Sequence, residues 1–260
     1  EHPRGQADKG LRMFQPAILN ELWEALGRVL DPELDTPITE LGFISELQID
    51  ERASQVRVRL RLPTFWCAAN FAYLMAQDAR KALLEVPGVT QVEVILEDHF
   101  AEEEISTGVN RGLSFKEIFP EEADEDLVSL RRRFTEKAYM QRHELLMRLL
   151  LRHLRPEEVV RLPLSALEED EEGVWLNWMG ERIVLSHATG LWSNYLSRRR
   201  ALGLEVSPEA PLGLDPAGLL IHPEALQEYL VRCRTTRLNI GFNRALCESL
   251  LDARYELGRL

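Results

Sequence analysis

The feature that most limits the fold of this chain is a strict alternation of apolar and polar residues over 55–62. Four apolar residues there alternate with a glutamine and three arginines. This period of two predicts a strand with one buried face and one solvated arginine face. A similar alternation over 46–50, joined to it by the short polar link 50–54, predicts a hairpin, and another over 91–97 predicts a further strand. We therefore expect one small sheet of three or more strands.

Helical periodicity surrounds these strands. Apolar positions recur at helical spacing over 16–30, and we expect this helix to end at Asp31-Pro32, because a residue before proline is disfavoured in helical conformation. A second helical face covers 71–86 and should end at Pro87-Gly88. The order helix, hairpin, helix, strand predicts an α+β fold, an α/β sandwich, over 15–118.

The remainder of the chain has a different character. Residues 1–14 are polar and aperiodic, which predicts a tail outside the fold. The acidic stretch 121–126 indicates a boundary between domains, and we expect residues 119–260 to form a second, mainly α-helical domain that docks a partner. Within it we expect a hairpin of 174–178 with 181–185, and helices over 187–202, 223–232 and 242–255.

Charge and composition exclude some classes of protein. The formal net charge of −12 disfavours binding to a phosphate backbone, so a nucleic-acid partner is not expected. No apolar run is long enough to span a bilayer, and no signal-peptide pattern opens the chain. Three scattered cysteines are too few for a disulfide framework. We expect a cytoplasmic protein without a membrane partner.

Cys67 is the residue best placed for chemistry. It follows Pro63-Thr64 and precedes the second helix, where backbone N–H groups and the helix dipole favour a thiolate, the form that acts as nucleophile and metal ligand. Thr64 could share this corner or only cap the helix. Cys233 and Cys247 lie within helical patterns, where burial is the expected reason for a cysteine.

Two acidic segments could support a metal site. Asp31 and Glu33 follow the first helix, and hard carboxylates beside a thiolate could hold iron, but the interpretation favoured by the sequence alone is that Asp31 only closes the helix end. Beyond the third strand, His99, Glu102 and Glu103 are weaker metal candidates, for which surface acidity is the competing explanation. A loop at His99 could meet the start of the Cys67 helix.

The sequence carries no complete enzyme signature. It has no Cys-x-x-Cys, Walker loop, Gly-x-Gly-x-x-Gly or His-Glu-x-x-His. One sulfur ligand cannot complete an iron-sulfur cluster, so cluster chemistry here would require ligands from another chain or from a client protein.

Residues 17–98 resemble the family of small iron-sulfur cluster assembly proteins that includes the phenylacetate-degradation maturation factor and the SUF-system accessory protein. The resemblance rests on four groups of residues: Asp31-Pro32-Glu33, Glu40-Leu41-Gly42-Phe43-Ile44, Thr64 with Cys67, and Pro87-Gly88-Val89 before Val92-Glu93-Val94. The family usually has aspartate where this chain has Glu40, and proline where it has Ala68.

The resemblance implies a maturation factor, not an enzyme, that helps insert iron-sulfur clusters into target proteins. Cys67 would contact the cluster or iron, held only transiently, and Asp31, Glu33 and Thr64 would line the site. The implied partners are an iron-containing client and the cluster-assembly machinery, with a homodimer as one further arrangement. Residues 98–110 look like a subgroup associated with bacterial multicomponent monooxygenases, which suggests such a client.

Two other hypotheses stay open. Cys67 paired with His99 as a base would make a thiol-dependent enzyme. The second domain also bears a faint likeness to the catalytic domain of tyrosine recombinases, through residues 154–158, Gly180-Glu181-Arg182 and Tyr255, which would make it a nucleic-acid binder. The His-x-x-Arg motif of those enzymes is not visible, so a degenerate helical scaffold for partner docking is preferred.

Overall fold

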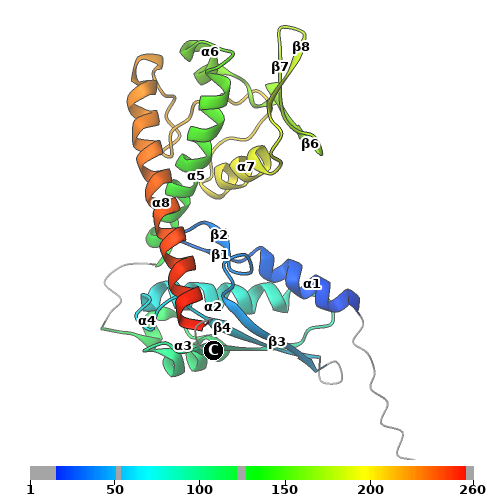
Figure 1. Cartoon of the computed structure of the whole chain (residues 1–260), viewed down its shortest axis with the longest axis vertical. Helices are drawn as coiled ribbons and strands as arrows, with labels where there is room; N and C mark the ends of the chain where they lie inside the picture. The colour runs from blue at the N-terminus through cyan, green and yellow to red at the C-terminus, as the bar shows by residue number, and fades with distance from the viewer. Residues whose placement is uncertain (1–15, 51–53, 122–126, 256–260) are drawn as a thin grey trace, which may run out of the picture. The chain divides into compact units, whose positions relative to one another are not determined.

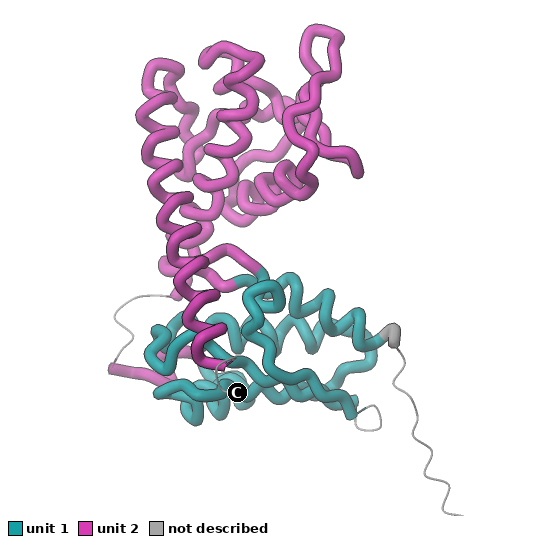
Figure 2. Tube along the Cα trace, in the orientation of Figure 1, with its two compact units in different colours: residues 1–30, 37–113 teal, residues 31–36, 114–260 magenta. Residues whose placement is uncertain are grey.

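The structure, a computed structural model, describes residues 16–50, 54–121 and 127–255. It divides into two compact units, residues 1–30 with 37–113 and residues 31–36 with 114–260 (Figure 2). The tail predicted over 1–14 lies outside the described residues. Among the helices that are described, none has the length and apolar character needed to cross a membrane.

The first unit contains a three-stranded sheet with the order β3-β4-β5 (Figure 1). Strand β3 (Ile44–Asp50) runs antiparallel to β4 (Gln55–Arg61), which confirms the predicted hairpin. Strand β5 (Gln91–Glu97) runs parallel to β4, and helix α2 (Ala69–Leu84) supplies the crossover that a parallel pair requires.

One face of this sheet is the core of the unit. Alternate residues of β4 and β5 are buried on it: Val56, Val58, Leu60, Val92, Val94 and Leu96. Helix α1 (Pro16–Gly27) contributes buried Leu22 and Leu26, and α2 contributes buried Tyr73 and Leu83. The expected α+β fold is therefore confirmed, and its hydrophobic core holds the start of α2 against the sheet.

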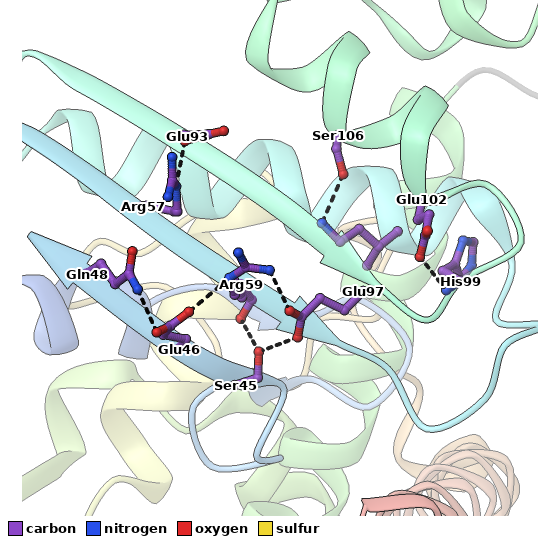
Figure 3. A network of polar contacts seen from close by, with 11 residues as sticks. Ser45, Glu46, Gln48, Arg57, Arg59, Glu93, Glu97, His99, Glu102 and Ser106 are labelled. Atoms are coloured by element: carbon purple, nitrogen blue, oxygen red, sulfur yellow. Dashed lines mark hydrogen bonds and ion pairs between the residues drawn. The ribbon is translucent and has the colours of Figure 1, made fainter.

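The opposite face carries the predicted arginines in cross-strand ion pairs (Figure 3). Arg57 pairs with Glu93 at 2.7 Å, and Arg59 pairs with Glu46 at 2.9 Å and with Glu97 at 2.8 Å. Pairs this exposed add little stability individually, but opposite charges on adjacent strands favour the observed register.

Helix α3 (Glu102–Asn110) covers the outer edge of β5 with side chains that replace a neighbouring strand. The Asn110 amide donates to the Val94 carbonyl and accepts from the Val94 N–H, both at 2.8 Å. The Ser106 hydroxyl accepts from the Leu96 N–H at 2.9 Å. These bonds occupy backbone groups that would otherwise be open for edge pairing.

Asn110→Ala should destabilise the first unit by about 1–3 kcal/mol, because both polar groups of Val94 lose their partner. Urea unfolding and hydrogen exchange at the Val94 amide would measure the loss. Gln48→Ala, at an exposed position on the same sheet, is the matched control. Unchanged stability together with unchanged exchange at Val94 would contradict the proposed role of Asn110.

Helix α1 ends at Gly27, not at the predicted Asp31. The N–H groups of Arg28 and Val29 bond to carbonyls three residues back, which tightens and closes the last turn. The chain then forms the short strand β1 (Leu30–Asp31), paired with β2 (Thr36–Pro37). The position of Asp31 before a proline correctly predicted that Asp31 is not helical, but it did not predict where the helix ends.

The second unit is mainly helical, as expected. Its helices are α4 (Phe115–Ile118), α5 (Leu127–Leu150), α6 (Pro156–Arg161), η1 (Leu164–Ala166), α7 (Leu191–Ala201), η2 (Pro223–Ala225) and α8 (Leu226–Tyr255). The predicted hairpin is present as β7 (Gly173–Trp178) and β8 (Glu181–Ser186), and an unpredicted strand, β6 (Leu167–Asp170), extends it. The two helices predicted over 223–232 and 242–255 form most of one continuous helix, α8.

A buried polar group joins the three long helices of this unit. His143 Nδ1 of α5 lies 2.8 Å from the hydroxyl of Tyr229 of α8, and the Tyr139 hydroxyl of α5 lies 3.4 Å from the Tyr195 hydroxyl of α7. Within α7, the Arg199 guanidinium donates to the same Tyr195 hydroxyl at 2.7 Å. Burial, and then the nearby Arg199 charge, lower the pKa of His143 to about 3. The folded state therefore holds this imidazole neutral.

This buried histidine predicts that the second unit loses stability as the pH falls from 7 to 5. The unfolded chain takes up a proton near the ordinary histidine pKa of 6.5, whereas the folded state does not until about 3. The loss attributable to His143 should be about 2 kcal/mol. Urea unfolding at several pH values would show a smaller loss in His143→Gln, with the exposed His153→Gln as control. Equal pH dependence in His143→Gln and wild type would contradict the assignment.

Candidate functional site

The predicted pair Thr64 and Cys67 lies together in a tight turn after β4. The Cys67 N–H donates to the Thr64 carbonyl at 3.4 Å, which closes the turn. The Thr64 hydroxyl then lies 3.3 Å from Cys67 Sγ, a distance at which it can donate to the sulfur. The cysteine is half-buried, so one side of the thiol is held by the protein and another faces solvent.

Cys67 precedes α2 by two residues. The helix begins at Ala69, and Ala68 occupies the N-cap position without any side-chain cap. Thr64 therefore does not cap the helix, since its hydroxyl is turned toward sulfur. The Ala68 φ of −60° and ψ of 131° match the backbone of a proline, the residue usual at this position in the family that the sequence resembles.

His99 fixes the cysteine turn through its backbone, not through its thiol. Its Nε2 lies 2.7 Å from the Cys67 carbonyl, and its Nδ1 accepts from the Ala101 N–H at 3.1 Å. Because Nδ1 accepts a hydrogen bond from a backbone N–H, it carries no proton, and the imidazole is the neutral tautomer with its proton on Nε2. The Nε2–H group therefore donates to the Cys67 carbonyl. The ring is only 2% exposed. In this arrangement neither nitrogen is available to act as a base for Cys67 or to bind a metal.

Glu102 and Glu103 lie in the exposed first turn of α3, where negative charge interacts favourably with the helix dipole. A Glu102 carboxylate oxygen lies 3.5 Å from the His99 backbone nitrogen, and Figure 3 shows this contact beside the sheet. Across the described segments, no three histidine, cysteine or acidic side chains converge where they could hold a metal ion. The metal contact predicted for His99, Glu102 and Glu103 stays a prediction.

Asp31 and Glu33 group with the second unit, unlike Thr64 and Cys67. An Asp31 carboxylate oxygen accepts from the N–H groups of Glu33 and Leu34, each at 2.8 Å, and shapes the turn. Burial raises the pKa of Asp31 to about 6, against the lowering effect of these two bonds. Glu33 accepts from the Asn243 side chain of α8 at 3.2 Å. Both carboxylates therefore have structural partners.

The ion pairs of Asp35 in the same loop were not predicted. The side chain is almost fully buried and pairs with Arg142 of α5 and, at 2.5 Å, with Arg198 of α7. Its φ of 51° places the backbone in the left-handed region, which aspartate tolerates better than most residues. Nothing in the local sequence indicates these partners, because both arginines are distant along the chain.

Comparison with known proteins adds independent information on residues 19–94, which match the family described as iron-sulfur cluster assembly protein. An uncharacterized protein of Methanocaldococcus jannaschii is 30% identical over 86 residues, which are 33% of this chain and 87% of that protein. The chain belongs to the iron-sulfur cluster assembly protein family. The matched segment contains Asp31, Glu33, Thr64 and Cys67 but ends before His99.

Two relatives with named functions match this chain over very different shares of their own lengths. The iron-sulfur cluster carrier protein of Mycobacterium leprae is 38% identical over 73 residues, 28% of this chain and 18% of that protein. The Fe-S protein maturation auxiliary factor YitW of Bacillus subtilis is 28% identical over 81 residues, 31% of this chain and 76% of that protein. The chain thus spans about a fifth of the length of the carrier proteins it matches.

The backbone at Ala68 predicts that proline is accepted there. In the described part of the chain the Ala68 N–H donates no hydrogen bond, so Ala68→Pro should raise the free energy of unfolding by about 0.4–1 kcal/mol. Ala72→Pro is the contrasting variant, because the Ala72 N–H donates to the Ala68 carbonyl at 3.1 Å, and it should lose about 3 kcal/mol. Urea unfolding measures both, and a destabilised Ala68→Pro would refute this geometry.

Proposed function

We propose that this chain is an accessory factor that helps assemble an iron-sulfur cluster or insert it into a client protein, with Cys67 as the ligand that contacts the cluster. The observation that carries the proposal is the Thr64–Cys67 pair, with the hydroxyl 3.3 Å from the sulfur, inside the segment that matches the family. The cluster is cargo in this proposal, not a resident cofactor.

Cys67 suits this role better than Cys233 does. Cys233 is buried within α8, and its burial raises the pKa of that thiol to about 11, so it stays protonated near neutral pH. Cys67 is only half-buried, so its sulfur is more accessible to iron, and the Thr64 hydroxyl lies 3.3 Å from that sulfur. Because thiolate is the form that binds iron, Cys67 is the stronger candidate ligand.

A single thiolate supports a shared site. A cluster of two or four irons takes about four protein ligands, and no group of three or more cysteine, histidine or acidic side chains that could hold a metal ion is found among the described residues. The missing ligands would come from the client or from a second copy of the chain. Transfer then needs no electron: a client thiolate forms a bond to iron while the bond from iron to Cys67 breaks, and Cys67 departs as thiolate.

The finer parts of the proposal follow from the sequence. A multicomponent monooxygenase is the candidate client, the cytoplasm is the expected compartment, and Asp31 and Glu33 are proposed to support the site. The cluster would be held transiently, and the second unit would dock a partner. A thiol-dependent enzyme is not favoured, because His99 is bonded to the Cys67 carbonyl instead of its sulfur.

Anaerobic transfer of a cluster tests the role of Cys67. The full chain would be reconstituted with iron and sulfide and mixed with a plant-type apoferredoxin, whose visible absorption reports the transferred cluster. Cys67→Ser should reduce transfer to the rate seen without the chain, because serine is a poor ligand for iron. Cys233→Ser and Cys247→Ser are the matched controls and should transfer normally. Transfer by Cys67→Ser at the wild-type rate would overturn the proposal.

A further inference from the structure

Three exposed aromatic side chains gather beside Cys67, and we name Phe65, Trp66 and Phe100 the aromatic patch. Trp66 is 76% exposed, and Phe65 and Phe100 are 42% and 41% exposed. The Trp66 and Phe100 rings stack at 5.9 Å, and Phe65 meets Trp66 edge-on at 4.9 Å. A continuous aromatic surface therefore adjoins the proposed ligand.

The patch is held in a fixed arrangement by its backbone. Its two segments are joined by the Phe100 N–H, which donates to the Phe65 carbonyl at 3.1 Å, and by the bond from His99 to the Cys67 carbonyl. The His99 ring also packs against Phe100 at 4.6 Å. Because rigid tryptophan and phenylalanine side chains lose little entropy on binding, such a surface is suited to contact a partner.

Acidic residues surround the patch on one side. Asp98 precedes Phe100, and the first turn of α3 follows it with Glu102, Glu103 and Glu104, all four of them exposed. Among the described residues no cation lies over the rings of Phe65, Trp66 or Phe100. The ring faces are thus open to a cation from outside, next to carboxylates that would pair with it.

We propose that the aromatic patch docks a segment of the client protein that carries arginine or lysine among apolar residues, close to the cysteines that receive the cluster. The proposal rests on the proposed function, since it gives the client's contact beside Cys67. Arginine would stack its guanidinium on Trp66 or Phe100 while pairing with the carboxylates of α3. The apolar neighbours would cover Phe65.

The same charges argue against other occupants. A second copy that docked symmetrically through the same patch would bring the acidic turn of α3 against its own counterpart. Nucleic-acid bases could stack on the rings, but their phosphates would meet Asp98 and Glu102 to Glu104. An anionic membrane surface would be repelled in the same way. The complement of this patch is therefore basic and apolar.

Synthetic hexapeptides test the patch in the full chain. The probe has the sequence Gly-Arg-Leu-Arg-Leu-Gly, with Gly-Glu-Leu-Glu-Leu-Gly and Gly-Arg-Ser-Arg-Ser-Gly as controls, all with blocked ends. The chain is labelled with 5-fluorotryptophan and observed by fluorine NMR. The resonance that Trp66→Phe removes is the Trp66 signal among those of the five tryptophans. We expect the arginine–leucine peptide to shift that signal and to bind at least about tenfold more tightly than either control. Equal shifts with all three peptides, or none, would overturn the proposal.

Variants locate the binding site. Trp66→Ala should weaken binding by about tenfold, whereas Trp23→Ala, at a 39% exposed tryptophan of α1, should leave it unchanged. Replacing Glu102, Glu103 and Glu104 together by glutamine should also weaken binding, most strongly at low salt. Equal losses in the two tryptophan variants would overturn the proposal. The proposal would also be overturned if the chain self-associated, bound single-stranded DNA or bound phosphatidylserine vesicles, and Trp66→Ala abolished that activity. Each of these results would assign the patch to another occupant.

The test separates the patch from the proposed function. Cys67→Ser keeps the aromatic rings and should bind the arginine–leucine peptide normally while it loses cluster transfer. Normal peptide binding with transfer that does not depend on Cys67 would contradict the proposed function and leave the patch intact. Loss of transfer in Cys67→Ser without selective peptide binding by the wild type would contradict the patch alone.

Discussion

The hydrogen bond from His99 Nε2–H to the Cys67 carbonyl is the contact on which the candidate site depends. The histidine is buried, its other nitrogen accepts from Ala101, and its ring packs against Phe100. One neutral side chain therefore fixes the backbone that carries the thiol and the turn that carries an exposed aromatic ring. A protonated imidazole could not accept from Ala101, so the same arrangement that orders the site also excludes His99 from proton transfer.

The sheet makes this contact possible because β4 and β5 run parallel and end at the same edge. The cysteine turn follows β4 and His99 follows β5, so the register that pairs Arg61 with Glu97 brings the two turns together. Helix α3 then secures the outer edge of β5 through Ser106 and Asn110. The crossover leaves β4 through the cysteine turn and returns through α2 to the start of β5, so Cys67 lies at the beginning of this connection. The position of Cys67 is thus a consequence of topology as much as of its immediate neighbours.

Much of this arrangement could be predicted from the sequence, because alternation over 55–62 and 91–97 is a strong signal that depends only on local spacing. The hairpin follows from the alternation over 46–50 and 55–62, and the helix between the strands follows from the helical spacing of apolar residues over 71–86. The pairing of Asn110 with Val94 and of Asp35 with Arg142 could not be predicted, because they join residues distant along the chain. The bond between Thr64 and Cys67 was missed for a different reason: a threonine before a helix usually caps it, and here the alternative acceptor is a sulfur. The aromatic patch has no periodicity and depends on two turns that meet only in the fold.

The loop from Asp31 to Thr36 contains acidic residues that have structural partners in this chain. Its carboxylates are engaged: Asp31 shapes its own turn, Glu33 contacts Asn243, and Asp35 pairs with two arginines. A carboxyl group that burial makes harder to ionise is a weaker ligand for a hard metal ion, because the metal binds the charged form. For Asp31 to assist Cys67 at a cluster, its side chain would have to exchange two backbone bonds for iron. A thiolate with a free side carries no such cost, so in this chain the sulfur is the more accessible ligand and the carboxylates act first through the shape of the loop.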